Sequence, residues 1–151
     1  MTVCLILLGL LLTFIWGNSL LPGEVSGAFS AWVKDTLADL FGWERADQDP
    51  AGHGLIRKLA HFTEFFALGL DLCWLMHMLC RKKWHAALFA LGCGFLAACT
   101  DETIQRFVPG RGPGWVDVGI DTLGIILGIG SLLLVLLIKH KKIKFLEENK
   151  S

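Results

Sequence analysis

Four long apolar stretches constrain the fold of this chain more than any other feature. They run from Thr2 to Leu21, Ile56 to Cys80, Trp84 to Thr103 and Val118 to Ile138. Each approaches the roughly 20 mainly apolar residues that a helix needs to cross a membrane. Hydrophobic residues make up 54% of the chain, and its mean hydropathy of +0.56 is too high for an ordinary soluble domain. We therefore predict an all-α fold, a four-helix transmembrane bundle forming a single domain over residues 1–151.

The first stretch has two interpretations, a secretory signal peptide and a retained membrane anchor. No basic residue precedes its apolar run, and Gly17-Asn18-Ser19 is only a weak cleavage site. The retained anchor is therefore favoured.

The charges of the connections predict the orientation of the spans. Arg81-Lys82-Lys83 follows the second stretch, and the tail over residues 139–151 opens with Lys139-His140-Lys141-Lys142. Lys and Arg are enriched in cytoplasmic connections, so both clusters are expected in the cytoplasm. The connection over residues 22–55 carries six acidic residues against Lys34 and Arg45, which suits the outer side. Both termini of this multi-pass chain are then cytoplasmic.

The outer connection contains an apolar stripe with helical spacing. Its members are Phe29, Trp32, Val33, Thr36, Leu37, Leu40 and Phe41. This spacing predicts an amphipathic helix that lies on the membrane as an anchor, with a lid over a lipid-exposed site as the alternative. The polar residues 42–54, rich in Asp and Gly, are predicted to form a loop.

Polar residues gather at one end of the spans, and antiparallel spans would bring three polar groups together at the outer face. The first group is Lys58, His61 and Glu64, spaced three residues apart on one helix face. Ionisable side chains cost on the order of 2.5 to 3.5 kcal/mol at the centre of a span, so they normally face partners or water. The group either binds a ligand, or Lys58 reaches the surface while His61 and Glu64 pair with a neighbouring helix.

The second group, Asp101, Glu102, Gln105 and Arg106, ends the third span. Asp101 and Gln105 share a helix face, and Glu102 is rotated from it by about 100°. Adjacent carboxylates can act as general acid and base, hold a divalent cation or bind a basic partner, and they can also be a solvated helix end. His61, Asp101 and Glu102 are the candidates for catalysis, although the residues indicate no reaction.

A loop with two prolines and three glycines, Phe107 to Trp115, leads to the third group and is predicted to turn tightly. The guanidinium of Arg111 at its centre suits a carboxylate or phosphate of a ligand, or a structural pair with Asp101 or Asp117.

Asp117 and Asp121 begin the fourth span. Gly124 and Gly128 follow on the same face, and small residues at this spacing predict close helix contact. A buried Asp121 needs a cation, which Lys58, His61 or Arg111 could supply.

Three motifs occur in order: Lys58-x-x-His61-Phe62-x-Glu64-Phe65-x-x-Leu68-Gly69, Asp101-Glu102-x-x-Gln105-x-Phe107-x-Pro109-Gly110-Arg111 and Asp117-x-x-x-Asp121-x-x-Gly124-x-x-x-Gly128. Together they resemble the VanZ-like family over roughly residues 57–132, about half the chain. The resemblance implies a small protein of the bacterial cell membrane. The namesake of that family is associated with resistance to the glycopeptide teicoplanin.

These observations predict an outward-facing site that binds an anionic ligand of the cell envelope, such as a lipid-linked cell-wall precursor or the glycopeptide itself. The alternatives are a small oligomeric transporter or lipid translocator, with Asp71 as a coupling group, and an accessory structural subunit of an envelope complex. Membrane lipids are expected partners, and a homo-oligomer is compatible with the sequence. The expected ligand-binding residues are Lys58, His61, Glu64, Asp101, Glu102, Gln105, Arg106, Arg111, Asp117 and Asp121.

Other classes of partner find no support in the sequence. The formal net charge is zero and the basic residues form only short blocks, so no nucleic-acid partner is expected. The five cysteines lie in or beside apolar runs without ligand-like spacing. We therefore expect neither a metal site nor a cofactor.

Overall fold

The structure is a computed structural model that describes residues 1–42, 50–112 and 114–149. The helices in this part of the chain are α1 (Thr2–Ser19), α2 (Gly23–Phe41), α3 (Pro50–Leu79), α4 (Lys83–Arg106) and α5 (Trp115–Glu148), and none of the described residues forms a strand. All except α2 are long and apolar enough to cross a membrane. The predicted all-α fold with four candidate spans is confirmed.

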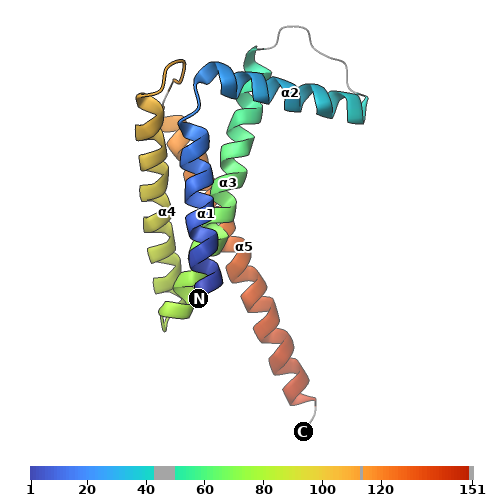
Figure 1. The fold of residues 1–151 in the computed structure, drawn as a ribbon. Coiled ribbons are helices and arrows are strands. Elements are labelled where there is room, and N and C mark those ends of the chain that lie inside the picture. Colours follow the sequence, from blue (N-terminus) through green and yellow to red (C-terminus); the bar gives the residue numbers. More distant parts are fainter. Residues whose placement is uncertain (43–49, 113, 150–151) are drawn as a thin grey trace.

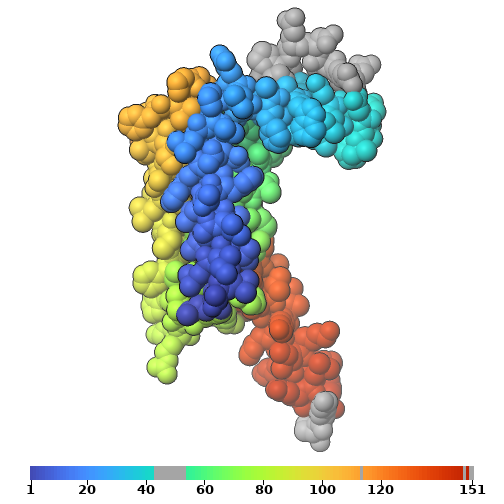
Figure 2. All heavy atoms as spheres, viewed as in Figure 1, coloured from blue at the N-terminus to red at the C-terminus, as the bar shows by residue number. Residues whose placement is uncertain are grey.

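The four long helices pack side by side, and α3 contacts each of the other helices. At one end of the bundle, α2 runs across the point where α1 ends and projects to one side (Figure 1). The start of α1 lies towards the opposite end, and there the last turns of α5 extend beyond the bundle (Figure 1). The space-filling view shows α1 covering one face of the bundle beneath the start of α2 (Figure 2).

Large apolar side chains form the core between the helices. Ile15, Phe65, Leu68 and Ile125 are fully buried. Many leucines on the outer surfaces are exposed, Leu10, Leu88 and Leu134 among them. This distribution is typical of helices whose outer faces contact lipid tails rather than water.

Glycines allow α3 and α5 to approach closely. A Cβ atom at Gly124 would lie 2.6 Å from the carbonyl oxygen of Phe62, and one at Gly69 would lie 2.5 Å from that of Ile125. A Cβ at Gly128 would collide with the carbonyl of Phe66. The close contact predicted from the spacing of Gly124 and Gly128 is therefore present.

A helix, α2, forms where the apolar stripe predicted one. Phe29, Trp32 and Leu40 on the stripe are all more than 60% exposed, so the described residues leave most of this face uncovered. The helix ends at Gly42, whose φ of 66° is the left-handed conformation that favours glycine at a helix C-terminus. Its contact with a membrane stays a prediction.

The loop predicted over residues 42–54 is wrong at its end, because α3 already begins at Pro50. Proline is well suited to the first position of a helix, where the backbone N–H has no helical partner. Residues 43–49 of the predicted loop lie outside the described part of the chain.

Candidate functional site

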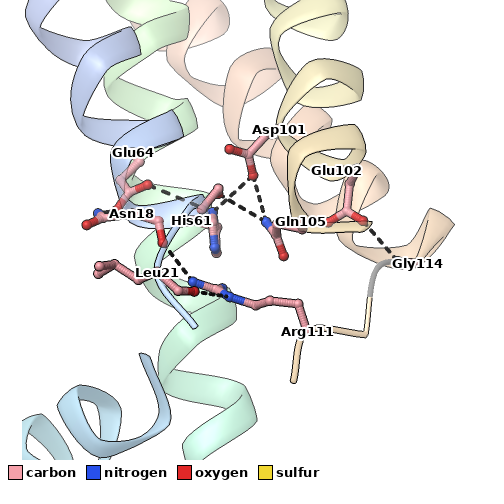
Figure 3. A network of polar contacts seen from close by, with 10 residues as sticks. Asn18, Leu21, His61, Glu64, Asp101, Glu102, Gln105, Arg111 and Gly114 are labelled. Atoms are coloured by element: carbon pink, nitrogen blue, oxygen red, sulfur yellow. Dashed lines mark hydrogen bonds and ion pairs between the residues drawn. The ribbon is translucent and has the colours of Figure 1, made fainter. Parts of the chain in front are cut away.

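Polar side chains from α1, α3, α4 and the loop before α5 meet at the end of the bundle that α2 crosses (Figure 3). We call this set the polar cluster, and its members are Asn18, Ser19, His61, Glu64, Asp101, Gln105 and Arg111. Asp101 is 0% exposed, and Gln105 is also buried. The predicted convergence of the polar groups is present, and it lies inside the bundle rather than on its surface.

The imidazole of His61 lies between two carboxylates. Its Nδ1 atom is 3.8 Å from Asp101 Oδ2 and 3.8 Å from Glu64 Oε2. Both separations are too long for a hydrogen bond. The arrangement can hold a proton or a cation between the ring nitrogen and the carboxylate oxygens.

Hydrogen bonds tie α4 and α3 to the end of α1. Gln105 Nε2 donates to Asp101 Oδ2 at 2.7 Å and to Ser19 Oγ at 3.2 Å, as the shared helix face of Gln105 and Asp101 predicts. Asn18 Nδ2 donates to Glu64 Oε1 at 2.9 Å. Sequence reasoning considered Asn18 and Ser19 only as part of a cleavage site. Their position at the end of an apolar stretch, where the other polar residues also gather, could have indicated that they belong to the polar cluster.

Arg111 binds backbone rather than carboxylates. Its Nε donates to the carbonyl of Leu21 at 3.1 Å, and its Nη2 donates to the carbonyl of Asn18 at 2.7 Å. These carbonyls lie in the last turn of α1 and just after it, where i to i+4 partners are missing, and the carbonyl of Asn18 also accepts a 3.2 Å bond from Leu21 N. The predicted structural pair of Arg111 with Asp101 or Asp117 is therefore wrong.

The remaining nitrogen of Arg111, Nη1, is buried and has no hydrogen-bond partner among the described residues. Burial and the neighbouring charge of Arg57 lower the pKa of Arg111, while nearby carboxylates, Asp101 first, raise it. An arginine stays charged under such shifts. Nη1 is thus a charged, buried donor without a partner among the described residues.

The loop before α5 is held against the start of α2. Gly23 N donates to the carbonyl of Pro109 at 3.0 Å, and Arg111 N donates to that of Val108 at 3.3 Å. Gly110 has a φ of 73°, which a residue with a side chain rarely adopts. The predicted tight turn is confirmed, and it fixes the backbone from which Arg111 projects.

Glu102 and Asp117 have structural partners near the polar cluster. Glu102 Oε2 accepts a 2.9 Å hydrogen bond from Gly114 N, at the N-cap of α5, where a carboxylate also interacts favourably with the helix dipole. Asp117 Oδ1 lies 3.5 Å from Lys58 Nζ. The side chains of Lys58 and Asp117 are 40% and 26% exposed, so this ion pair belongs to the rim of the site.

Asp121 is 2% exposed, yet it has neither a hydrogen bond nor an ion pair within the described residues. Lys58 pairs with Asp117, and Arg111 binds carbonyls. The expectation that either of them is the cation for Asp121 is therefore wrong. Of the predicted cations, His61 lies close to Asp121. His61, Asp101 and Asp121 form a group whose possible ligand atoms all lie within 4.8 Å of one another.

Two predicted residues lie apart from the polar cluster. Arg106 is exposed and lines a separate cavity of about 230 Å³ beside Glu102 and Trp115. Asp71 is half-buried, and its Oδ2 atom has no hydrogen-bond partner in the described part of the chain.

A cavity with a volume of about 420 Å³ borders the polar cluster. We call it the α1–α3 cavity, and its lining residues are Phe14, Asn18, Leu21, Val25, Ser26, Phe29, Ser30, Arg57, Ala60, His61, Glu64 and Arg111. Arg57 was missed by sequence reasoning, although it precedes Lys58 at the same end of the span.

The fold and this site define a class of small all-helical proteins that have four candidate membrane spans and a buried polar cluster at one end. The family model described as VanZ/LLP1 matches residues 3–138. The chain therefore belongs to the VanZ-like family. Comparisons with curated proteins and with solved structures gave no match.

Proposed function

We propose that this VanZ-like membrane protein binds the anionic headgroup of a lipid-linked envelope molecule in the α1–α3 cavity, at the outer face of the membrane. The observation that carries the proposal is the composition of that cavity, whose lining contains both charged hydrogen-bond donors and apolar side chains. A volume of about 420 Å³ is in the range of small-molecule sites.

The charged part of the cavity favours an anion. Its lining contains two guanidinium groups, Arg57 and Arg111, against one carboxylate, Glu64. Guanidinium groups bind phosphate and carboxylate oxygens through strong, charge-assisted hydrogen bonds. The Nη1 of Arg111, which has no partner among the described residues, would supply one such donor while Nε and Nη2 keep their bonds to Leu21 and Asn18.

The apolar part of the cavity favours a ligand that also carries a hydrocarbon chain. Phe14, Leu21, Val25 and Phe29 line it, and each is more than 40% exposed on the outside of the helices. An opening between such side chains lets a headgroup enter while its chain stays among lipid tails. Lipid-linked phosphates of the cell wall have this chemistry. On this basis, deletion of the protein is expected to change the susceptibility of its host to teicoplanin.

The test is the binding of a polyprenyl phosphate to the purified protein in nanodiscs, compared with the polyprenol that lacks the phosphate. Arg57→Gln should weaken binding of the phosphate about tenfold, because a hydrogen bond to a charged group contributes roughly 1.5–3 kcal/mol. Arg106→Gln is the matched control, since Arg106 lies at the same end but lines another cavity. Equal binding of phosphate and polyprenol, or equal losses in the two variants, would refute the proposal.

A further inference from the structure

We propose that His61, Asp101 and Asp121 bind a divalent transition-metal ion of the zinc class. Each residue comes from a different helix, α3, α4 and α5, and their ligand atoms all lie within 4.8 Å of one another. This inference goes beyond the proposed headgroup binding and does not depend on it. It also revises the expectation of no metal, which considered only the spacing of residues along the sequence.

Two members of the group carry buried atoms without a hydrogen-bond partner. Asp101 is 0% exposed, and its Oδ1 atom has no hydrogen-bond partner within the described residues. The same holds for Nδ1 of His61. Buried carboxylates and imidazole nitrogens without partners are costly, so such groups are normally paired or coordinate a metal.

Among the described residues, no lysine or arginine lies within ion-pair distance of Glu64, Asp101 or Asp121. Glu64, Asp101 and Asp121 are mostly or fully buried, whereas Lys58 is 3.5 Å from Asp117 and Arg111 donates to backbone carbonyls. The Asn18 amide satisfies one oxygen of Glu64 but carries no charge. A divalent ion beside His61 would supply the missing positive charge where the carboxylates converge.

The geometry of the group suits a small ion. The 3.8 Å between His61 Nδ1 and Asp101 Oδ2 is close to the separation of about 3.3 Å that two ligands of a tetrahedral zinc ion have. A cavity of about 10 Å³ beside the group is lined by His61 and Asp121 and also by Arg57 and Lys58, and this is about the space of one water molecule. Small side-chain rotations would therefore complete the coordination.

The donor set selects the class of metal. One imidazole nitrogen with two carboxylates suits zinc and its transition-metal neighbours, whereas calcium and magnesium prefer oxygen ligands alone. Gln105 donates to Asp101 Oδ2 at 2.7 Å, which is the kind of outer contact that orients a carboxylate ligand. Three protein ligands leave a position open for water or a ligand oxygen.

The test is metal binding by the full chain in detergent after treatment with a chelator. Titration with zinc is followed by calorimetry, and cobalt is the spectroscopic probe because a tetrahedral cobalt site absorbs visible light. The expected result is one tight site per chain, with affinity at least tenfold weaker in both His61→Gln and Asp121→Asn. His140→Gln is the control, since His140 is exposed near the end of α5 and should not change the site.

Circular dichroism of each variant is used to check that its helices are retained. If His61→Gln does not fold, the test rests on Asp121→Asn, which is nearly isosteric with the wild type. A wild-type chain that binds zinc no more tightly than Asp121→Asn would overturn the inference. It would show that His61 simply forms an ion pair with Asp101. Loss of the site in His140→Gln would equally overturn it, because binding would then come from the surface.

Discussion

Arg111 Nη2 donates a 2.7 Å hydrogen bond to the backbone carbonyl of Asn18, which joins the loop before α5 to the end of α1. The side chain of Asn18 in turn donates to Glu64 on α3. Arg111 and Asn18 together thus link the loop before α5, α1 and α3, and Arg111 directly follows the turn at Gly110. The stability of this end of the bundle and the shape of the α1–α3 cavity should therefore respond to the same substitutions.

Arg111→Ala should destabilise the protein by roughly 1.5–3 kcal/mol, because charge-assisted hydrogen bonds to the carbonyls of Asn18 and Leu21 are lost. The measurement is the free energy of unfolding in mild detergent. Arg106→Ala is the control, and since Arg106 is exposed its effect should stay within about 0.5 kcal/mol. Equal effects of the two substitutions would contradict the role assigned to Arg111.

Gly124→Ala should destabilise the contact of α3 with α5 by about 1–3 kcal/mol, because the new methyl group would lie 2.6 Å from the carbonyl oxygen of Phe62. Gly130→Ala on the same helix is the matched control. A Cβ at Gly130 would meet no described atom within 4 Å, so this change should be neutral or stabilising through helix propensity. Thermal unfolding of both variants gives the comparison, and a more stable Gly124→Ala protein would exclude the close packing described above.

Gly110→Ala should cost about 1–2 kcal/mol, since its φ of 73° is unfavourable for a residue with a Cβ atom. Because the turn positions Arg111, the same variant should also bind polyprenyl phosphate more weakly. Gly112→Ala serves for comparison, as a Cβ there would have no described neighbour within 4 Å. Unchanged stability and binding in Gly110→Ala would show that the loop conformation does not matter.

Asp71→Asn should leave the binding of polyprenyl phosphate unchanged, because Asp71 does not line the α1–α3 cavity. The substitution also separates binding from transport. If the protein moves its ligand across a membrane with Asp71 as a coupling group, uptake by proteoliposomes should fall while affinity is retained. Weaker binding in Asp71→Asn would contradict the location of the site.

The sequence predicted the fold well because each span is defined by its own apolar length. The bond of Gln105 to Asp101 was also predictable, since residues four apart share a helix face. The partners of Arg111 were not, because backbone carbonyls at the end of α1 leave no mark in a pattern of side chains. Asn18 and Ser19 were missed for a related reason. Two small polar residues after an apolar run also fit a cleavage site, and only the packing of α1 against α3 and α4 reveals their contacts.

The position of a bound lipid-linked phosphate tests the central claim most directly. A polyprenyl phosphate with a photoreactive group near its phosphate would be crosslinked to the protein in nanodiscs, and the modified residues would be identified by mass spectrometry. The account predicts crosslinks in the α1–α3 cavity, at residues such as Leu21, Val25 and Phe29, that excess unlabelled polyprenyl phosphate removes. Crosslinks concentrated instead around Trp115 and Thr103, in the cavity beside Arg106, would contradict it.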